Sequence, residues 1–336
     1  MVYLFLGLGI ALLLICGDAL VRGAVALSVR LGIPTLVIGL TIVAFGTSAP
    51  ELVVSLRAAL AGAPGIAIGN VVGSNIANIL LVLGLPAIIV ATATKQDFVV
   101  RNTLYVILAT LVFIALCLVG PLTFWHGAVL FGLLLAFLWG QAKQAEQHKD
   151  MATVLGEEAM ELLEEDATQG RNAWQISGLL LVGLIGLPLA ATLTVDSASE
   201  IARRFQVSEE VIGLTLVALG TSLPELATTL TAALKGHPAL AIGNVLGSNL
   251  FNLLAVMGVT AMVAPVPVPP GFLRADLWIM LGAAVLLLPF VLKGYEIGRK
   301  AGIGFMAAYL GYLYFSFASH AGAMAQAIEA AGHLPK

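Results

Sequence analysis

The chain has 336 residues, of which 60% are hydrophobic and only 10% are charged, and its net charge is −3 at pH 7. Soluble domains contain roughly 45–50% apolar and about 25% charged residues, so the composition excludes an ordinary soluble globular protein. The chain also lacks the basic stripe of nucleic-acid-binding proteins, which excludes nucleic acid as the main partner.

Long apolar runs recur along the whole chain, whose mean hydropathy is +1.01. A helix needs about 20 apolar residues to cross a bilayer, and each run is long enough. The sequence therefore predicts an all-α, polytopic membrane protein embedded in the lipid bilayer. Polar, proline and glycine breaks divide it into ten spans, near residues 2–28, 34–61, 65–90, 101–120, 122–141, 174–204, 209–234, 238–264, 275–293 and 302–330.

A single long polar stretch, residues 141–172, divides the spans into two sets of five. We predict a first five-helix unit over residues 1–140, an acidic cytoplasmic loop over 141–172 and a second five-helix unit over 173–336. Within the loop, acids alternate with Met160, Leu162 and Leu163 between Glu157 and Asp166, a pattern that favours a surface amphipathic helix.

The two units are copies of one another. GLTIVAFGTSAPEL at residues 39–52 returns as GLTLVALGTSLPEL at 213–226, and residues 62–84 align with 236–258 at the same offset of 174, without a gap. The repeated regions are thus 39–84 and 213–258. Because each copy holds an odd number of spans, the second enters the membrane from the opposite side, which predicts inverted repeats typical of secondary transporters.

The distribution of Lys and Arg sets the orientation. Most basic residues fall into connections on one side of the membrane when the N-terminus is outside. Under the positive-inside rule, we expect both termini outside and the acidic loop in the cytoplasm.

Glu51 and Glu225 occupy matching positions in the middle of predicted spans. A charge at that depth costs roughly 2.5–3.5 kcal/mol or more on insertion scales and marks a functional site by default. Inverted symmetry brings the two carboxylates together, where only a bound cation relieves their repulsion. Carboxylates, hydroxyls, amides and free carbonyls suit hard cations such as Ca²⁺ or Na⁺. The alternative is a pair of protonated, hydrogen-bonded structural carboxyls.

Each glutamate follows a proline that breaks its span. Pro50 and Pro224 cannot donate to the carbonyls of Gly46 and Gly220, so we expect a kink that also loosens the neighbouring threonine carbonyls. Irregular backbone at membrane depth is tolerated where it lines a cavity or is buried in protein, and the two breaks therefore predict one shared site.

The spans that follow carry matched polar side chains and small residues. Ser74 and Asn78 share one helix face because they are four residues apart, and we consider the polar side chains here to be outer ligands. The glycines favour close helix packing over a ligand role. The matched polar pairs are Asn70 with Asn244, Ser74 with Ser248, Asn75 with Asn249, and Asn78 with Asn252, and the small-residue stripes are Gly65, Gly69 and Gly73 with Ala239, Gly243 and Gly247.

The paired segments GTSAPE/GTSLPE and GNVVGSNIAN/GNVLGSNLFN resemble the two alpha-repeats of the calcium/cation antiporter superfamily, close to prokaryotic sodium/calcium exchangers. The resemblance covers both halves. It implies an integral protein of a prokaryotic inner membrane, in which Glu51 and Glu225 bind Ca²⁺ with help from the carbonyls of Thr47 and Thr221. Flanking sodium sites would be lined by Ser48, Ser74, Ser222 and Ser248.

One position departs from the pattern, since related exchangers often carry an aspartate where this chain has Asn252. An amide there leaves two negative charges, which suffice for one Ca²⁺ but accommodate three Na⁺ less well. We therefore predict exchange of Ca²⁺ for Na⁺ by alternating access, in which the first and sixth spans move against a core, and keep Ca²⁺/H⁺ exchange as the alternative.

Other classes of function remain open on the residues alone. A cation channel would use the same oxygen ligands around a continuous pore, and a membrane sensor would act through the acidic loop. Asp18 has no acidic mate in the second repeat, which favours a helix-packing or interfacial role and gives a poor match to a two-aspartate intramembrane protease. We expect no enzyme, no cofactor besides the transported ions and no obligate protein partner.

Overall fold

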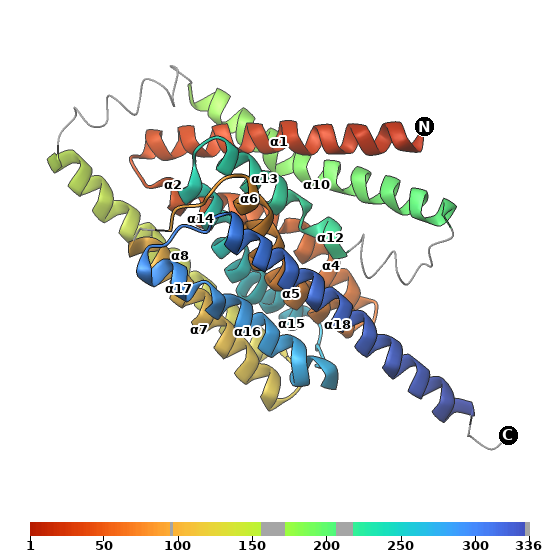
Figure 1. The fold of residues 1–336 in the computed structure, drawn as a ribbon. Coiled ribbons are helices and arrows are strands. Elements are labelled where there is room, and N and C mark those ends of the chain that lie inside the picture. Colours follow the sequence, from red (N-terminus) through yellow and green to blue (C-terminus); the bar gives the residue numbers. More distant parts are fainter. Residues whose placement is uncertain (95–96, 156–171, 206–217, 333–336) are drawn as a thin grey trace.

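The computed structural model describes residues 1–94, 97–155, 172–205 and 218–332. Within these residues every regular element is a helix (Figure 1), and seven helices are long and apolar enough to cross a membrane. A bent pair, Thr35–Thr47 followed by Ala49–Leu60, makes an eighth span. The predicted seventh span falls partly on residues 206–217, outside the described part. The all-α membrane fold predicted from the sequence is confirmed.

The first half contains the helices that lead to and follow the first repeated region. In chain order they are α1 (Val2–Leu31), α2 (Thr35–Ile38), the π-helical η1 (Gly39–Val43), α3 (Ala44–Thr47), α4 (Ala49–Leu60), α5 (Pro64–Ala77), the π-helical η2 (Asn78–Leu83), α6 (Gly84–Ile89), α7 (Asp97–Val119) and α8 (Phe124–Leu155). Helix α8 continues to Leu155, beyond the predicted end of the fifth span at residue 141. The acid-rich run 157–166 lies outside the described residues.

The second half has the same order. Its elements are α10 (Ala173–Arg204), α12 (Ala218–Thr221), α13 (Leu223–Leu234), α14 (Pro238–Phe251), the π-helical η4 (Asn252–Val256), α15 (Met257–Val263), the π-helical η5 (Phe272–Asp276), α16 (Leu277–Leu286), α17 (Leu288–Lys293) and α18 (Arg299–Gly332). Helix α18 corresponds to the predicted tenth span.

Local sequence explains several of these helix ends. Helix α1 stops at Gly32, whose φ of 66° is left-handed, a conformation that glycine adopts without steric cost. Helix α10 starts with a capping box between Asn172 and Gln175. Proline stands in the first turn of α4, α5, α13 and α14, where its missing N–H leaves no hydrogen bond unmade.

Two short backbone bridges establish that the repeats are inverted. Thr92, after the third span, exchanges both hydrogen bonds with Ile297, before the tenth, and Leu122 does the same with Val266. Thr92 and Val266 are repeat mates at the offset of 174. In repeats of equal orientation, the connections after the third and the ninth spans would lie at opposite ends of the bundle. The bridges join them at one end, as inversion requires.

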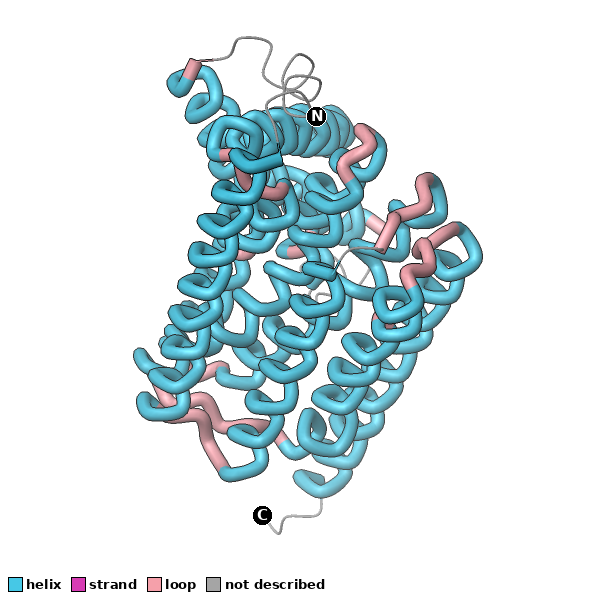
Figure 2. The backbone as a smooth tube through the Cα atoms, turned by 90° about the vertical axis from the view of Figure 1, so that its left-hand side faces the viewer, coloured by secondary structure: helices cyan, strands magenta, loops and turns pink. Residues whose placement is uncertain are grey.

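Helices α1 and α10 lie side by side across one face of the remaining bundle (Figure 1), and in the turned view the chain begins at the same upper edge of the bundle (Figure 2). They run antiparallel, because Gly9 faces Thr194 whereas Gly23 faces Leu180. Their buried side chains, such as Leu20 and Leu187, belong to a second hydrophobic cluster, which also includes Ile38, Val43 and Leu240 of the bundle, whereas the larger core lies around α5, α7, α14 and α16. The fold therefore consists of a core and an attached pair of helices.

Close helix packing surrounds the first residues of the second GNVLGSN segment. A Cβ added to Gly243 would lie 2.6 Å from the carbonyl oxygen of Leu36, and one added to Gly247 would lie 2.6 Å from the Cβ of Ala44. The predicted packing role is confirmed for these two glycines. Around Gly73 the described residues leave open space within 4 Å.

Candidate ion-binding site

The two proline-containing spans break at matching serines. Helix α3 ends at Thr47 and α4 begins at Ala49, with Ser48 between them at φ −84° and ψ 4°, and the two segments are bent by 42°. In the second repeat Ser222 separates α12 from α13 at φ −87° and ψ 2°. Backbone bonds run from Ser48 N to Ala44 O and from Leu52 N to Ser48 O, and neither uses the carbonyl of Thr47. The predicted break is confirmed in both repeats.

The breaks place each glutamate in the first turn of a new helix. Glu51 lies at the start of α4 and Glu225 at the start of α13, and both side chains are 0% exposed. A helix N-terminus carries unpaired N–H groups and a partial positive charge, which stabilise a carboxylate. The two glutamates approach one another across the repeats, since Ser48, three residues before Glu51, contacts the carboxylate of Glu225.

Hydrogen bonds across the two repeats reach the carboxylate of Glu225. Ser48 Oγ donates to Glu225 Oε1 at 3.3 Å, and Ser248 Oγ donates to the same oxygen at 3.4 Å. Ser248 also lies 3.3 Å from the hydroxyl of Thr47. One side chain of the first repeat, Ser48, therefore contacts the glutamate of the second directly, and Thr47 contacts it through Ser248.

Two asparagines at matching positions, half-buried Asn70 and buried Asn244, repeat one hydrogen-bond pattern. Asn244 Nδ2 donates to the carbonyl of Glu225 at 3.4 Å and to the hydroxyl of Thr229 at 3.0 Å, and its Oδ1 accepts from Thr47 of the other repeat at 3.3 Å. Asn70 contacts the mates of these groups, namely Glu51 O at 3.2 Å, Ser55 Oγ at 2.9 Å and Thr221 Oγ1 at 3.4 Å. The two-fold relation of the repeats thus extends to single atoms.

Several buried polar atoms at the site have no hydrogen-bond partner among the described residues. They include both Oε atoms of Glu51, Oε2 of Glu225, Oγ of Ser222 and the side-chain amides of Asn78 and Asn252. Unpaired buried polar groups are rare in native proteins and point to a missing ligand, ion or water. Here most of them are oxygens.

Asn78 and Asn252 each begin a π-helical turn, η2 and η4. Such turns are rare and often occur at functional sites. Sequence patterns did not reveal them, because the residues that follow each asparagine in these turns are all apolar and show no periodicity that a change of helix type could alter.

All ten predicted site residues are buried. Hydrogen bonds join four of them, Thr47, Ser48, Glu225 and Ser248. Ser55 and Thr229 were missed, although both are hydroxyl residues at the repeat offset. In the described part of the chain, no group of three or more His, Cys, Asp or Glu side chains could hold a metal ion.

A family model described as sodium/calcium exchanger protein matches residues 1–143 and 176–318, one segment in each half. The chain belongs to this exchanger family. The family comprises ion transporters, not enzymes, and the resemblance seen in the paired motifs is confirmed.

Relatives of the exchanger match it over nearly its whole length. The inner membrane protein YrbG of Escherichia coli (strain K12) is 35% identical over 316 residues, which cover 91% of this chain and 95% of that protein. The sodium/calcium exchanger MaX1 of Methanosarcina acetivorans is 31% identical over 344 residues, which cover 94% and 98%. A solved structure of the sodium-calcium exchanger NCX_Mj, soaked with 2.5 mM Na⁺ and 1 mM Sr²⁺, matches with a TM-score of 0.79 at 32% identity, covering 93% of this chain and 97% of that chain.

Proposed function

We propose that this exchanger moves Ca²⁺ against Na⁺ across the membrane by alternating access at one central site, with Glu51 and Glu225 as the charged ligands. The observation that carries the proposal is the convergence of two fully buried carboxylates from inverted repeats, with three of their four oxygens unpartnered among the described residues. MaX1 is named as a sodium/calcium exchanger, which supports the same pair of ions.

Ca²⁺ takes six to eight oxygen ligands at about 2.3–2.6 Å. Glu51 and Glu225 supply the charge, and the carbonyls of Thr47 and Thr221 at the two breaks supply neutral oxygens. Ser48, Ser222, Ser74 and Ser248 would line flanking Na⁺ sites, with Asn78 and Asn252 as outer ligands. Competition of the two ions for one set of carboxylates gives the coupling.

The empty site controls the conformational step. Two carboxylates without a cation are costly in a dry interior, so only a neutralised site crosses readily between the two states. Helices α1 and α10, which pack against each other and against the bundle through the smaller hydrophobic cluster, are the elements that move against the core. Each ion then gains access from one side at a time.

A second candidate, exchange of Ca²⁺ for H⁺, is favoured by one observation. Asn78 and Asn252 are both neutral amides with unpartnered side-chain atoms, so the site holds two negative charges in all. Two protons neutralise these as well as one Ca²⁺ does. Exchange of three Na⁺ for one Ca²⁺ moves one net charge, worth about 2.3 kcal/mol per 100 mV, whereas exchange of two protons for one Ca²⁺ is insensitive to voltage.

The cellular setting of the proposal follows from the relatives and the charge pattern. YrbG is named as an inner membrane protein, and we place this exchanger in the same kind of membrane, with both termini outside and residues 141–172 in the cytoplasm. The repeats 1–140 and 173–336 would act together without an obligate protein partner.

Calcium uptake by proteoliposomes tests the proposal. Purified protein is reconstituted, and ⁴⁵Ca²⁺ uptake is driven by an outward Na⁺ gradient, an outward H⁺ gradient or neither. We expect saturable uptake with Na⁺, and its loss in the Glu51→Gln, Glu225→Gln double variant. Uptake driven by the H⁺ gradient alone would show exchange of Ca²⁺ for H⁺, the second candidate. Uptake without any counter-ion gradient indicates a channel, and no flux in any arm leaves only a sensor role.

A further inference from the structure

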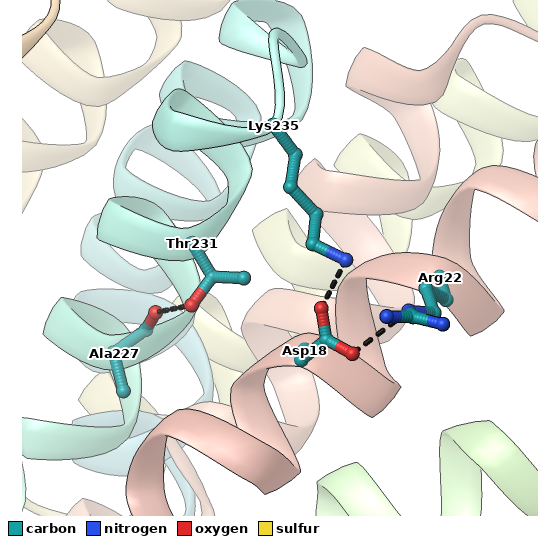
Figure 3. Close-up of polar contacts among 5 residues, drawn as sticks. All are labelled: Asp18, Arg22, Ala227, Thr231 and Lys235. Carbon is teal, nitrogen blue, oxygen red and sulfur yellow. Dashed lines mark hydrogen bonds and ion pairs between the residues drawn. The ribbon is translucent and has the colours of Figure 1, made fainter.

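The carboxylate of Asp18 on α1 joins two cations (Figure 3). Its Oδ2 lies 2.7 Å from Nε of Arg22, one turn further along the same helix, and its Oδ1 forms an ion pair with Nζ of Lys235. Lys235 caps the C-terminus of α13, the helix that begins with Glu225. The pair therefore ties the attached helix layer to an element of the ion site.

Beside this ion pair, small residues make the contact between α1 and α13. Gly17 faces α13 without a side chain, and a Cβ added there would lie 3.2 Å from both the carbonyl oxygen of Ala227 and the hydroxyl of Thr231. Thr231 donates its hydroxyl proton to Ala227 of its own helix at 2.7 Å (Figure 3). Among the described residues, Asp18–Lys235 is thus the one ion pair that holds α1 to α13.

This pair has no counterpart in the other repeat. At the offset of 174, Asp18 aligns with Thr192 and Lys235 aligns with Ala61. In a transporter built from inverted repeats, the two access states are related by exchanging the conformations of the repeats. By this symmetry we expect α10 on α4 to replace α1 on α13 in the opposite state, and Thr192 and Ala61 cannot form an ion pair there.

We propose that the Asp18–Lys235 ion pair is a latch that stabilises the arrangement of α1 seen here over the opposite access state. The latch presupposes the proposed exchange by alternating access. Arg22 also contributes, because it stays paired with Asp18 after Lys235 has moved away. The carboxylate is therefore never left unpaired while α1 moves, and the barrier between the states stays low.

Pulsed electron paramagnetic resonance measures the two populations without any transport. Nitroxides are placed at Leu4 on α1 and Leu60 on α4, both exposed, in a Cys16→Ala, Cys117→Ala background. We expect Asp18→Asn and Lys235→Gln each to shift the ratio of the two distance populations by roughly two- to five-fold, the strength of a partly exposed ion pair. The double variant should shift it no further than either single variant.

Glu200→Gln is the matched control, since Glu200 pairs with Arg204 within α10 at 3.1 Å and that pair stays intact when the helix moves as a unit. Unchanged distances in both latch variants, additive shifts in the double variant, or an equal shift with Glu200→Gln overturn the latch.

Transport then separates the latch from the proposed function. Half-saturating Ca²⁺ is measured on each side of oriented vesicles, because the apparent affinity on one side scales with the fraction of protein open to that side. We expect the two latch variants to lower the half-saturating concentration on one side and raise it on the other. A general loss of packing would raise both, which contradicts the latch. Failure of the wild-type chain to exchange ions refutes the proposed function, while the distance measurement still decides whether the pair biases α1.

Discussion

Ser48 of the first repeat donates a hydrogen bond to Glu225 of the second, with Oγ and Oε1 3.3 Å apart. The residue that breaks one span thus contacts the carboxylate that follows the break in the other. Side chains of both repeats thus meet at the carboxylate of Glu225, because Ser248 of the second repeat donates to the same oxygen. This arrangement underlies the following predictions.

The glutamates should be indispensable for Ca²⁺ binding. Replacing Glu51 or Glu225 by Gln removes a buried charge with little change in shape, and we expect Ca²⁺ uptake to fall by roughly 100-fold or more, beyond the loss typical of residues that only support a metal ligand. Glu200→Gln, a half-exposed carboxylate on α10, should retain uptake. A single glutamine variant with wild-type uptake would contradict the central role of the pair.

Asn252→Asp should change the coupling ion. A third carboxylate raises the negative charge of the site from two to three, which favours occupation by several Na⁺. We expect Na⁺-driven uptake to rise relative to H⁺-driven uptake and to become more sensitive to membrane voltage. Asn78→Asp tests whether the effect depends on the repeat. If both variants kept the counter-ion preference of the wild-type chain, the two amides would not determine which counter-ion is exchanged.

Asn70 and Asn244 should position the ligands without touching the ion. Asn244→Ala removes the bonds to Glu225 and Thr229, and we expect half-saturating Ca²⁺ to rise roughly 10–100-fold, as for other residues that orient metal ligands. Asn75→Ala is the control, because Asn75 is equally buried but donates to Val71 of its own helix. Equal effects of the two alanine variants would indicate general packing damage.

The packed glycines of α14 should tolerate no side chain. Gly243→Ala places a methyl group 2.6 Å from the carbonyl of Leu36, and overpacking of this kind costs about 1–3 kcal/mol. We expect a lower midpoint of thermal unfolding in detergent. Gly73→Ala, at a position with open space among the described residues, should unfold like the wild-type chain, and a comparable loss there would argue against the close approach as the cause.

The charge of Lys235 should be measurable at His237, which caps the start of α14. Burial, and then the nearby Lys235 ammonium, lower the pKa of His237. Folding lowers this pKa, so the contribution of His237 to stability is complete when the pH is above about 6.5, the ordinary pKa of histidine. This contribution is lost as the pH falls below that value. Lys235→Met removes this positive charge and should raise the pKa of His237. An NMR titration of the imidazole ring measures this pKa. An unchanged titration would place Lys235 further from His237 than the structure does.

The sequence determined the parts of this protein that depend on local pattern. Apolar runs of bilayer length established an all-helical membrane protein, and the offset of 174 residues paired Glu51 with Glu225 and Pro50 with Pro224. The breaks at Ser48 and Ser222 followed from the chemistry of proline, which acts within one helical turn. Inversion followed from counting spans, because an odd number reverses the direction of the second repeat.

Tertiary structure alone decided which residues meet. The bond from Ser48 to Glu225 joins positions 177 residues apart, and the pair of Asp18 with Lys235 has no repeat mate that could have revealed it. The π-helical turns at Asn78 and Asn252 also escaped sequence patterns. Periodicity reports which face of a helix is apolar, whereas these features depend on how two helix surfaces are rotated and shifted against each other, which is set by packing over the whole bundle.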